Sequence, residues 1–184
     1  MAARPPVPQH VPTHPGSSSL VVSRRMSTAK RRDTAAEIAL RRELHARGMR
    51  YRVAYPVPNQ RRRTIDVAFT RAKVAVFVDG CFWHGCLEHG TMPRSNGEWW
   101  RTKLAANEAR DRDTNRLLEE LDWIVVRVWE HERPNVAANR AEAAVLAARV
   151  ERKTRSSLAR PSERRSRGWP RPHPLPRSVP APRS

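Results

Sequence analysis

Two short apolar runs limit most strongly what this chain can fold into. Residues 123–129 (Trp-Ile-Val-Val-Arg-Val-Trp) and 73–78 (Lys-Val-Ala-Val-Phe-Val) are valine-rich and of strand length, which predicts two strands, the one at residues 73–78 being the more buried. Residues 64–69 alternate like a strand, and the short link at residues 71–72 makes them a hairpin with residues 73–78. Helical patterns precede, separate and follow these strands, at residues 34–47, 99–121 and 135–150. The order predicts a small α/β domain, with helices flanking a central mixed sheet.

Positive charge and proline are concentrated at the two ends of the chain. The 184 residues include 36 Lys+Arg, 18 Asp+Glu and 16 Pro, with a net charge of +18. Such a surplus indicates a polyanionic partner, most simply nucleic acid. We expect residues 1–25 to be a disordered Pro-rich extension, 26–150 the folded domain, and 151–184 a disordered tail rich in Pro, Arg and Ser. The tail is a solvated segment, a sequence-independent tether to phosphates, or both.

Composition excludes several other classes of protein. No apolar run approaches the roughly 18 residues that a membrane-spanning helix needs. The longest apolar run near the N-terminus, residues 20–22, is too short for the core of a signal peptide. The 2 cysteines exclude a secreted disulfide framework. We therefore expect a cytoplasmic, nucleoid-associated protein that does not contact a membrane.

The densest cluster of reactive side chains directly follows the strand at residues 73–78. Cys81, Cys86 and His89 lie within nine residues, and tetrahedral Zn²⁺ takes four nitrogen or sulfur ligands. His131, just after the strand at residues 123–129, completes the set if the two strands are neighbours. Spacing alone supports a zinc site and a pair of buried thiols beside a surface histidine about equally.

Three further residues are candidates for chemistry, and two of them have ordinary structural explanations. Asp66 stands in mid-strand, where aspartate is rare; it is either a solvent-facing residue or a ligand of Mg²⁺. His84 is a candidate base because its ordinary pKa lies near neutrality. Glu37 ends the sequence Thr34-Ala35-Ala36-Glu37, a capping box in which the carboxylate satisfies backbone N–H groups at a helix start.

The aromatic residues near this cluster also have two interpretations. Phe82, Trp83, Trp99 and Trp100 fit a hydrophobic core, which is the more common role of such residues. However, Phe82 and Trp83 lie in a loop bounded by glycine and cysteine. Aromatic side chains in such a loop are also suited to wedging between stacked bases.

Several segments together resemble one known family. They are residues 32–37, the strand that bears Asp66, and residues 77–84 (Phe-Val-Asp-Gly-Cys-Phe-Trp-His), 93–100, 110–113 and 128–130. These segments, spread over about residues 26–132, resemble very short patch repair endonucleases. Members of that family are mismatch-specific DNA nickases with a restriction-endonuclease-like fold. The resemblance implies Mg²⁺-dependent hydrolysis of one strand, 5′ to the thymine of a T·G mismatch left by deamination of 5-methylcytosine.

The resemblance also implies catalytic roles. Asp66 is similar to the family's metal-binding aspartate, with the backbone carbonyl of Val78 as a further ligand of Mg²⁺. His84 is similar to the catalytic histidine that activates water, and Glu37 to the glutamate that supports it. Asp79 stands where some members have histidine, and we expect it to be an additional acid near the metal.

Roles in DNA contact and zinc binding follow from the same resemblance. Phe82, Trp83 and Trp100 match aromatic residues that wedge into DNA beside the mismatch. Met26 falls on an N-terminal arm that inserts from the minor groove. Cys81 matches a structural zinc ligand, and the other ligands match in general position. The resemblance therefore favours a structural Zn²⁺ held by Cys81, Cys86, His89 and His131.

We expect a monomer that acts on double-stranded DNA containing a T·G mismatch, with catalytic Mg²⁺ and structural Zn²⁺, and that initiates very short patch repair. Two alternatives remain open at this stage. One is a restriction-like nuclease without mismatch specificity. The other is a zinc-stabilised DNA-binding module with no catalytic activity.

Overall fold

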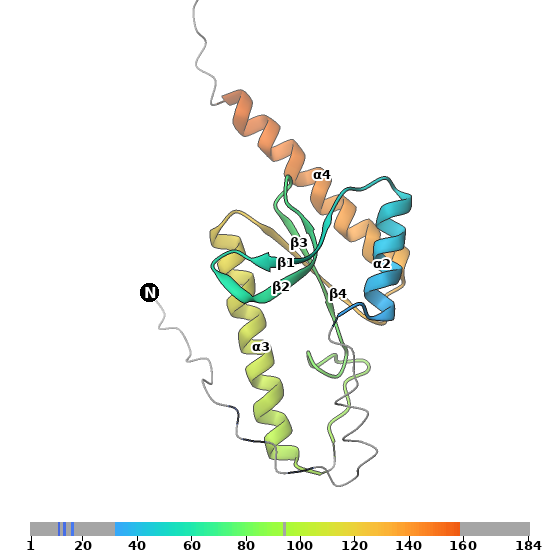
Figure 1. Ribbon diagram of the computed structural model, residues 1–184, viewed down its shortest axis with the longest axis vertical. Helices are drawn as coiled ribbons and strands as arrows, with labels where there is room; N and C mark the ends of the chain where they lie inside the picture. Colours follow the sequence, from blue (N-terminus) through green and yellow to red (C-terminus); the bar gives the residue numbers. More distant parts are fainter. Residues whose placement is uncertain (1–10, 12, 14–15, 17–31, 94, 159–184) are drawn as a thin grey trace, which may run out of the picture.

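A mixed four-stranded sheet with helices on both faces forms the body of the protein (Figure 1). The computed structural model describes residues 11, 13, 16, 32–93 and 95–158, and the statements below concern these residues. The strands, in the spatial order in which they pair, are β1 (Arg52–Val57), β2 (Gln60–Phe69), β3 (Val74–Asp79) and β4 (Ile124–Trp129). The helices are α2 (Ala35–Ala46), α3 (Gly97–Glu120) and α4 (Pro134–Leu158). The predicted α/β fold with a central mixed sheet is confirmed.

The sheet combines two antiparallel pairs with one parallel pair. β1 pairs with β2, and β2 with β3, in antiparallel fashion, whereas β3 and β4 are parallel. The parallel register runs from Val74 opposite Ile124 to Asp79 opposite Trp129. α3 lies between β3 and β4 in the sequence and provides the crossover that parallel strands require. The carboxyl ends of β3 and β4 therefore lie side by side.

Two apolar clusters cover the two faces of the sheet. On one face, Leu40 and Leu44 of α2 and a row of alanines from α4 pack against β2, β3 and β4. On the other face, Leu118 of α3 and Trp123 pack against Phe77 and neighbouring residues. Figure 1 shows α2 and α4 together on one side of the sheet and α3 on the other. In the described part of the chain, none of the helices has the length and hydropathy to cross a membrane.

Strand β1 was not predicted, because Pro56 and Pro58 disfavour a strand assignment in that segment. β1 lies at the edge of the sheet, where a missing N–H is tolerated. Its register with β2 shifts between Pro56 and Val57.

Helix α4 is longer than the pattern at residues 135–150 predicted. It continues to Leu158, because residues 151–158 contain no Gly or Pro that would end it. Arg152 also ties this last part of α4 to the β2–β3 turn by donating a hydrogen bond to the carbonyl oxygen of Arg71. Met26, the N-terminal extension apart from residues 11, 13 and 16, and the tail from residue 159 onward lie outside the described residues.

Candidate active site

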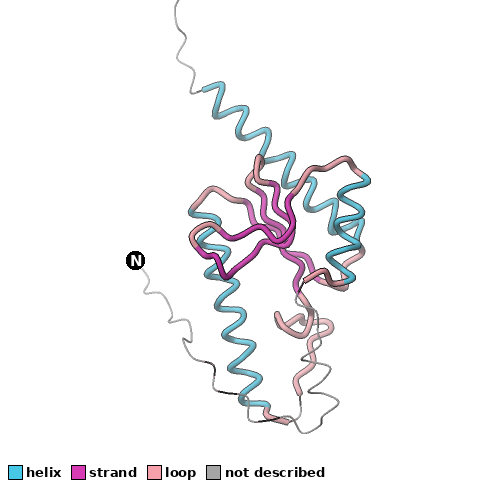
Figure 2. The backbone as a smooth tube through the Cα atoms, in the orientation of Figure 1, coloured by secondary structure: helices cyan, strands magenta, loops and turns pink. Residues whose placement is uncertain are grey.

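The candidate site is built on the carboxyl ends of β3 and β4 and on the loop that follows β3. This loop spans residues 80–96 before α3 begins (Figure 2). Its start is fastened to the end of β4 by two hydrogen bonds. The N–H of Glu130 donates to the carbonyl oxygen of Asp79 at 2.9 Å, and the N–H of Cys81 donates to the Glu130 carboxylate at 2.7 Å. The position of the loop thus depends on the parallel pairing of β3 and β4.

Asp66 lies among other acids rather than facing solvent. Its carboxylate accepts a hydrogen bond from the N–H of Val78 at 2.9 Å. Burial, together with the negative charges of Glu37 and Asp79, raises the pKa of Asp66 to about 6 from its ordinary 3.8, despite the opposing effects of the Val78 hydrogen bond and the Arg127 charge. The raised pKa means that burial and the neighbouring negative charges disfavour the charged form of Asp66. A bound cation would offset both effects, so this carboxylate is suited to binding one.

Glu37 does form the predicted capping box. One carboxylate oxygen accepts from the N–H of Asp33 and the other from the Thr34 hydroxyl, each at 3.0 Å. In return, the hydroxyl of Thr34 accepts from the N–H of Glu37 at 3.3 Å. The Glu37 side chain is buried, and its charge helps to raise the pKa of Asp66. Capping a helix and standing beside the candidate metal ligand are therefore compatible for this residue.

His84 is held by a neighbouring acid that sequence reasoning did not assign. Its Nδ1 lies 2.6 Å from Asp111 of α3 and 3.7 Å from Asp79. Burial alone would lower the pKa of His84, but the hydrogen bond with Asp111 and the charges of Asp79 and Asp111 outweigh it and raise the pKa. Burial likewise opposes ionisation of Asp111, yet the hydrogen bond with His84 and the charge of Arg127 lower the pKa of Asp111. The two residues therefore favour a charge-assisted hydrogen bond.

The structure brings four of the predicted residues together in one neighbourhood: Asp66, Glu37, Asp79 and His84. It adds two residues that sequence analysis gave no role, Asp111 and Arg127. Asp111 falls in the segment 110–113 that carries part of the family resemblance. Arg127 interrupts the valines of β4, and a charged residue in an otherwise apolar strand is the signal within β4 itself that pointed to it.

The predicted Cys/His cluster forms a compact group. The candidate ligand atoms of Cys81, Cys86, His89 and His131 all lie within 4.8 Å of one another. The Sγ of Cys81 is 3.0 Å from Nδ1 of His131, and the Sγ of Cys86 is 3.9 Å from Nδ1 of His89. A side chain at Gly90 would collide with the carbonyl oxygen of Cys86, so the tight turn around His89 depends on glycine. Two sulfurs and two imidazoles at such separations fit a tetrahedral metal site.

The aromatic residues next to this group pack on one another. Phe82 lies 5.1 Å from Trp83 and from Trp100 between ring centroids, in edge-to-face contacts. Trp100 also contacts Trp99 at 4.7 Å and is only 5% exposed. Phe82 and Trp83 are partly exposed. Trp100 is thus the buried member of this aromatic group, whereas Phe82 and Trp83 lie nearer the surface of the protein.

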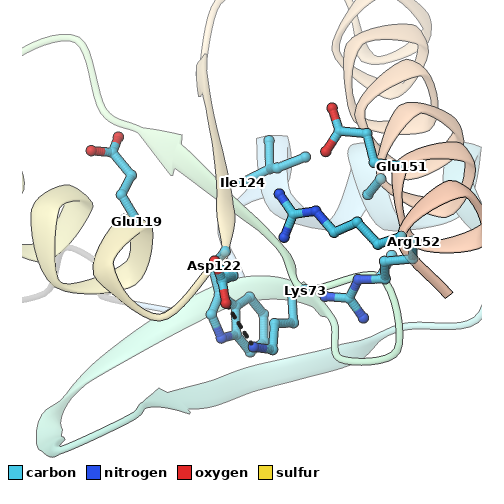
Figure 3. A pocket seen from close by; sticks show the side chains of 10 residues that line it. Lys73, Glu119, Asp122, Ile124, Glu151 and Arg152 are labelled. Atoms are coloured by element: carbon cyan, nitrogen blue, oxygen red, sulfur yellow. Dashed lines mark ion pairs between the residues drawn. The ribbon is translucent and has the colours of Figure 1, made fainter. Parts of the chain in front are cut away.

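A separate cavity of about 520 Å³ lies at the other end of the sheet, between α4 and the turns that precede β3 and β4. Figure 3 shows Glu151 and Arg152 of α4 lining it, together with the ion pair between Lys73 and Asp122. The Nζ of Lys73 lies 3.9 Å from the Asp122 carboxylate. None of its lining residues belongs to the predicted site. The carboxylates and His84 lie at the opposite end of these strands, where β3 ends at Asp79.

Comparison with known proteins agrees with this geometry. A family model described as DNA mismatch endonuclease Vsr matches residues 21–88. The type II nicking enzyme V.NaeI of Lentzea aerocolonigenes is 43% identical over 122 residues, which cover 65% of this chain and 74% of that protein. The chain belongs to the Vsr endonuclease family. DNA mismatch endonuclease Vsr of Escherichia coli K12 is 33% identical over 111 residues, covering 59% of this chain and 68% of that protein. The predicted resemblance is confirmed, and with it a DNA substrate and a nuclease fold.

Proposed function

We propose that this Vsr-family protein is a Mg²⁺-dependent mismatch endonuclease. It nicks one strand of duplex DNA 5′ to the thymine of a T·G mismatch that arises from deamination of 5-methylcytosine, and so initiates very short patch repair. The observation that carries the proposal is that the Asp66 carboxylate and the His84–Asp111 pair share two neighbours at one end of the sheet: the charges of Asp79 and Arg127 act on Asp66, and the same two residues contact His84 and Asp111. A cation site close to a histidine base is suited to metal-assisted phosphodiester hydrolysis.

The residues around Asp66 fit a hard divalent cation. Oxygen ligands are what Mg²⁺ prefers, and it is usually bound through one or two carboxylates together with phosphate oxygens and water. Asp66 and the carbonyl oxygen of Val78 would hold it, and Glu37 adds negative charge nearby. When bound, Mg²⁺ would neutralise the charge that builds on the phosphate during strand cleavage.

His84 is the proposed proton acceptor. Because Asp111 holds Nδ1 at 2.6 Å, Nδ1 carries the ring proton of the neutral form and Nε2 is the nitrogen that accepts a proton. The negative charges around the ring raise the pKa of His84, which makes it a stronger base than a free imidazole. Asp111 then stabilises the imidazolium that forms when His84 takes a proton from the attacking water.

Mismatch recognition is assigned to Phe82 and Trp83, with Trp100 as their support and Met26 on the N-terminal arm. An aromatic wedge pays an unstacking cost that is lowest at a mismatched step. The partly exposed position of Phe82 and Trp83, one and two residues before His84, supports this role. Insertion there would place the distorted step near the catalytic base.

A structural Zn²⁺ is assigned to Cys81, Cys86, His89 and His131. Bound there, the ion would cross-link the loop after β3 to His131, two residues beyond the end of β4. His84 and both wedge residues lie in this loop between or beside the zinc ligands. The metal would therefore fix the loop that carries recognition and catalysis.

The test compares nicking of a T·G duplex with nicking of the same duplex carrying T·A, each in all flanking contexts, with and without Mg²⁺. Mg²⁺-dependent cleavage of one strand at T·G, and much slower cleavage at T·A, supports the proposal. Two of the relatives described above differ in their names, one being a type II nicking enzyme and the other a mismatch endonuclease. This difference favours one second candidate, a nickase without mismatch preference, for which T·G and T·A duplexes would be cut at equal rates.

A further inference from the structure

Arg127 is the cation around which the acids of the site are arranged. Its Nη1 donates to both carboxylate oxygens of Asp79, at 2.7 and 2.8 Å. Nη2 lies 3.2 Å from Asp111, and Nε donates to the side-chain oxygen of Asn115 at 3.1 Å. The guanidinium carbon is also 4.9 Å from the centre of the Phe77 ring. A mostly buried guanidinium is tolerated only when its donors are satisfied in this way.

The contact with Asp111 links Arg127 to the proposed base. One oxygen of Asp111 meets Arg127, and the other meets Nδ1 of His84 at 2.6 Å. The carboxylate is therefore held at both ends and cannot rotate without breaking one of the two contacts. Since Asp111 orients the imidazole, a group that fixes Asp111 also fixes which ring nitrogen of His84 is free.

The contact with Asp79 bears on the role of that acid. Both of its carboxylate oxygens are engaged by Nη1 of Arg127, and one of them lies 3.7 Å from Nδ1 of His84. Asp79 as a whole is 6% exposed. An acid with both oxygens committed to a guanidinium has its charge balanced within the protein.

We infer that Arg127 is a positioning residue, which holds Asp111 so that His84 presents Nε2 to the substrate, and that Asp79 is the counter-ion of Arg127 rather than a ligand of the catalytic metal. This inference rests on the proposed function, because it assigns His84 the role of base. It extends that function by naming the group that keeps the base oriented.

The test uses Arg127→Met, Arg127→Lys, Asp79→Asn and the double variant Asp79→Asn/Arg127→Met. Arg116→Met is the matched control, since Arg116 lies on α3 with Asp111 but pairs with Asp113 and Glu120. Single-turnover nicking is measured on the duplex that the wild type cuts fastest. Two-bond ¹H–¹⁵N spectra of ¹⁵N-histidine protein report which nitrogen of His84 carries the proton, with His84→Gln assigning its signal among the 7 histidines.

We expect Arg127→Met to slow nicking by about 10- to 100-fold and to leave DNA affinity within about twofold. The His84 signal should change from the Nδ1–H form to a mixture of both ring tautomers. Arg127→Lys should recover part of the rate, because it keeps the charge and loses the fork that reaches two acids. Asp79→Asn should slow nicking without changing the Mg²⁺ concentration that gives half the maximal rate, and Arg116→Met should behave as the wild type.

The inference is overturned if Arg127→Met, or Arg127→Lys where the former does not fold, nicks at the wild-type rate with an unchanged His84 signal. A shift of about tenfold or more in the Mg²⁺ requirement of Asp79→Asn would make Asp79 a metal ligand and overturn its assignment as counter-ion. The double variant should be more stable than Arg127→Met, because it no longer buries the unpaired Asp79 charge; equal or lower stability would contradict the pairing. If the wild type nicks no duplex, the proposed function fails, while the His84 spectra still decide whether Arg127 orients the ring.

Discussion

Replacing Asp66 by asparagine is expected to stabilise the metal-free protein at neutral pH while it abolishes nicking. In the folded protein, burial and the charges of Glu37 and Asp79 raise the pKa of Asp66 to about 6 from 3.8. The folded state therefore holds this proton more tightly than the unfolded chain does. The resulting penalty on folding is absent below the unfolded pKa and grows as the pH rises, until it is complete above the folded pKa.

The size of the effect follows from the shift in the pKa. A difference of about 2 units corresponds to roughly 3 kcal/mol of destabilisation once Asp66 is ionised in both states. Asparagine has nearly the same shape and still accepts the hydrogen bond from the N–H of Val78, but its new amide donors need partners, at a cost of about 1 kcal/mol. We therefore expect Asp66→Asn to be more stable than the wild type by about 2 kcal/mol at pH 8.

The assay is urea unfolding followed by tryptophan fluorescence at pH 5 and pH 8, in buffer free of Mg²⁺ but without a chelator. Between these two pH values, the stability advantage of Asp66→Asn should grow by about 1.5 kcal/mol. Asp122→Asn is the matched control, because the Asp122 side chain is 74% exposed and its ion pair with Lys73 contributes little. Added Mg²⁺ should stabilise the wild type and not Asp66→Asn. An advantage that is the same at both pH values, or absent at pH 8, would refute the reasoning.

Three further predictions concern the rest of the site. Elemental analysis should find zinc in the wild type and little or none in Cys86→Ala. This variant should also unfold at a lower temperature, because a structural metal site contributes folding energy. Wild-type protein that contains no zinc when purified without a chelator would contradict the assignment. Trp83→Ala should weaken binding to the T·G duplex by about 1–3 kcal/mol with little change in melting temperature. Trp100→Ala should lower the melting temperature, because Trp100 is buried. Equal melting temperatures for the two variants would contradict this division between a wedge residue and a supporting residue. Glu37→Gln should keep the helix cap and therefore its stability. A nicking rate lower by about 100-fold at unchanged stability would show a catalytic role for Glu37, whereas an unchanged nicking rate would restrict Glu37 to capping.

Local patterns in the sequence were sufficient for most of the fold. The apolar runs predicted β3 and β4, and helical periodicity predicted α2, α3 and most of α4. β1 was missed because an edge strand tolerates prolines that a central strand does not. The end of α4 was misplaced for a related reason. Proline content was used to mark where order ends, and the first proline of the tail comes only at Pro161, after the helix has stopped.

The site was predictable where its residues are close in sequence. Cys81, Cys86 and His89 could be recognised as a possible metal site because they lie in one loop. His131 could be added to this predicted ligand set only by assuming that β3 and β4 are neighbours. Asp111 could not be placed in the same way. Its contact with His84 depends on the rotation of α3 against the sheet, and the sequence pattern does not specify that rotation closely enough.

Arg127 differs from Asp111 in this respect, because the assumption that placed His131 also places Arg127. In the parallel pair, Phe77 of β3 lies opposite Arg127 of β4, and Asp79 lies opposite Trp129. Phe77 and Asp79 are two residues apart on β3, so their side chains are on the same face of the sheet. Asp79 is therefore on the same face as Arg127 and close to it. A guanidinium that is mostly removed from solvent, as that of Arg127 is, requires a counter-charge, and Asp79 is the acid that ends the neighbouring strand. The same step gives Asp79 a partner within the sheet, which supports its assignment as the counter-ion of Arg127. Strand adjacency together with this register therefore accounts for the ion pair, and with it the role tested through Arg127→Met.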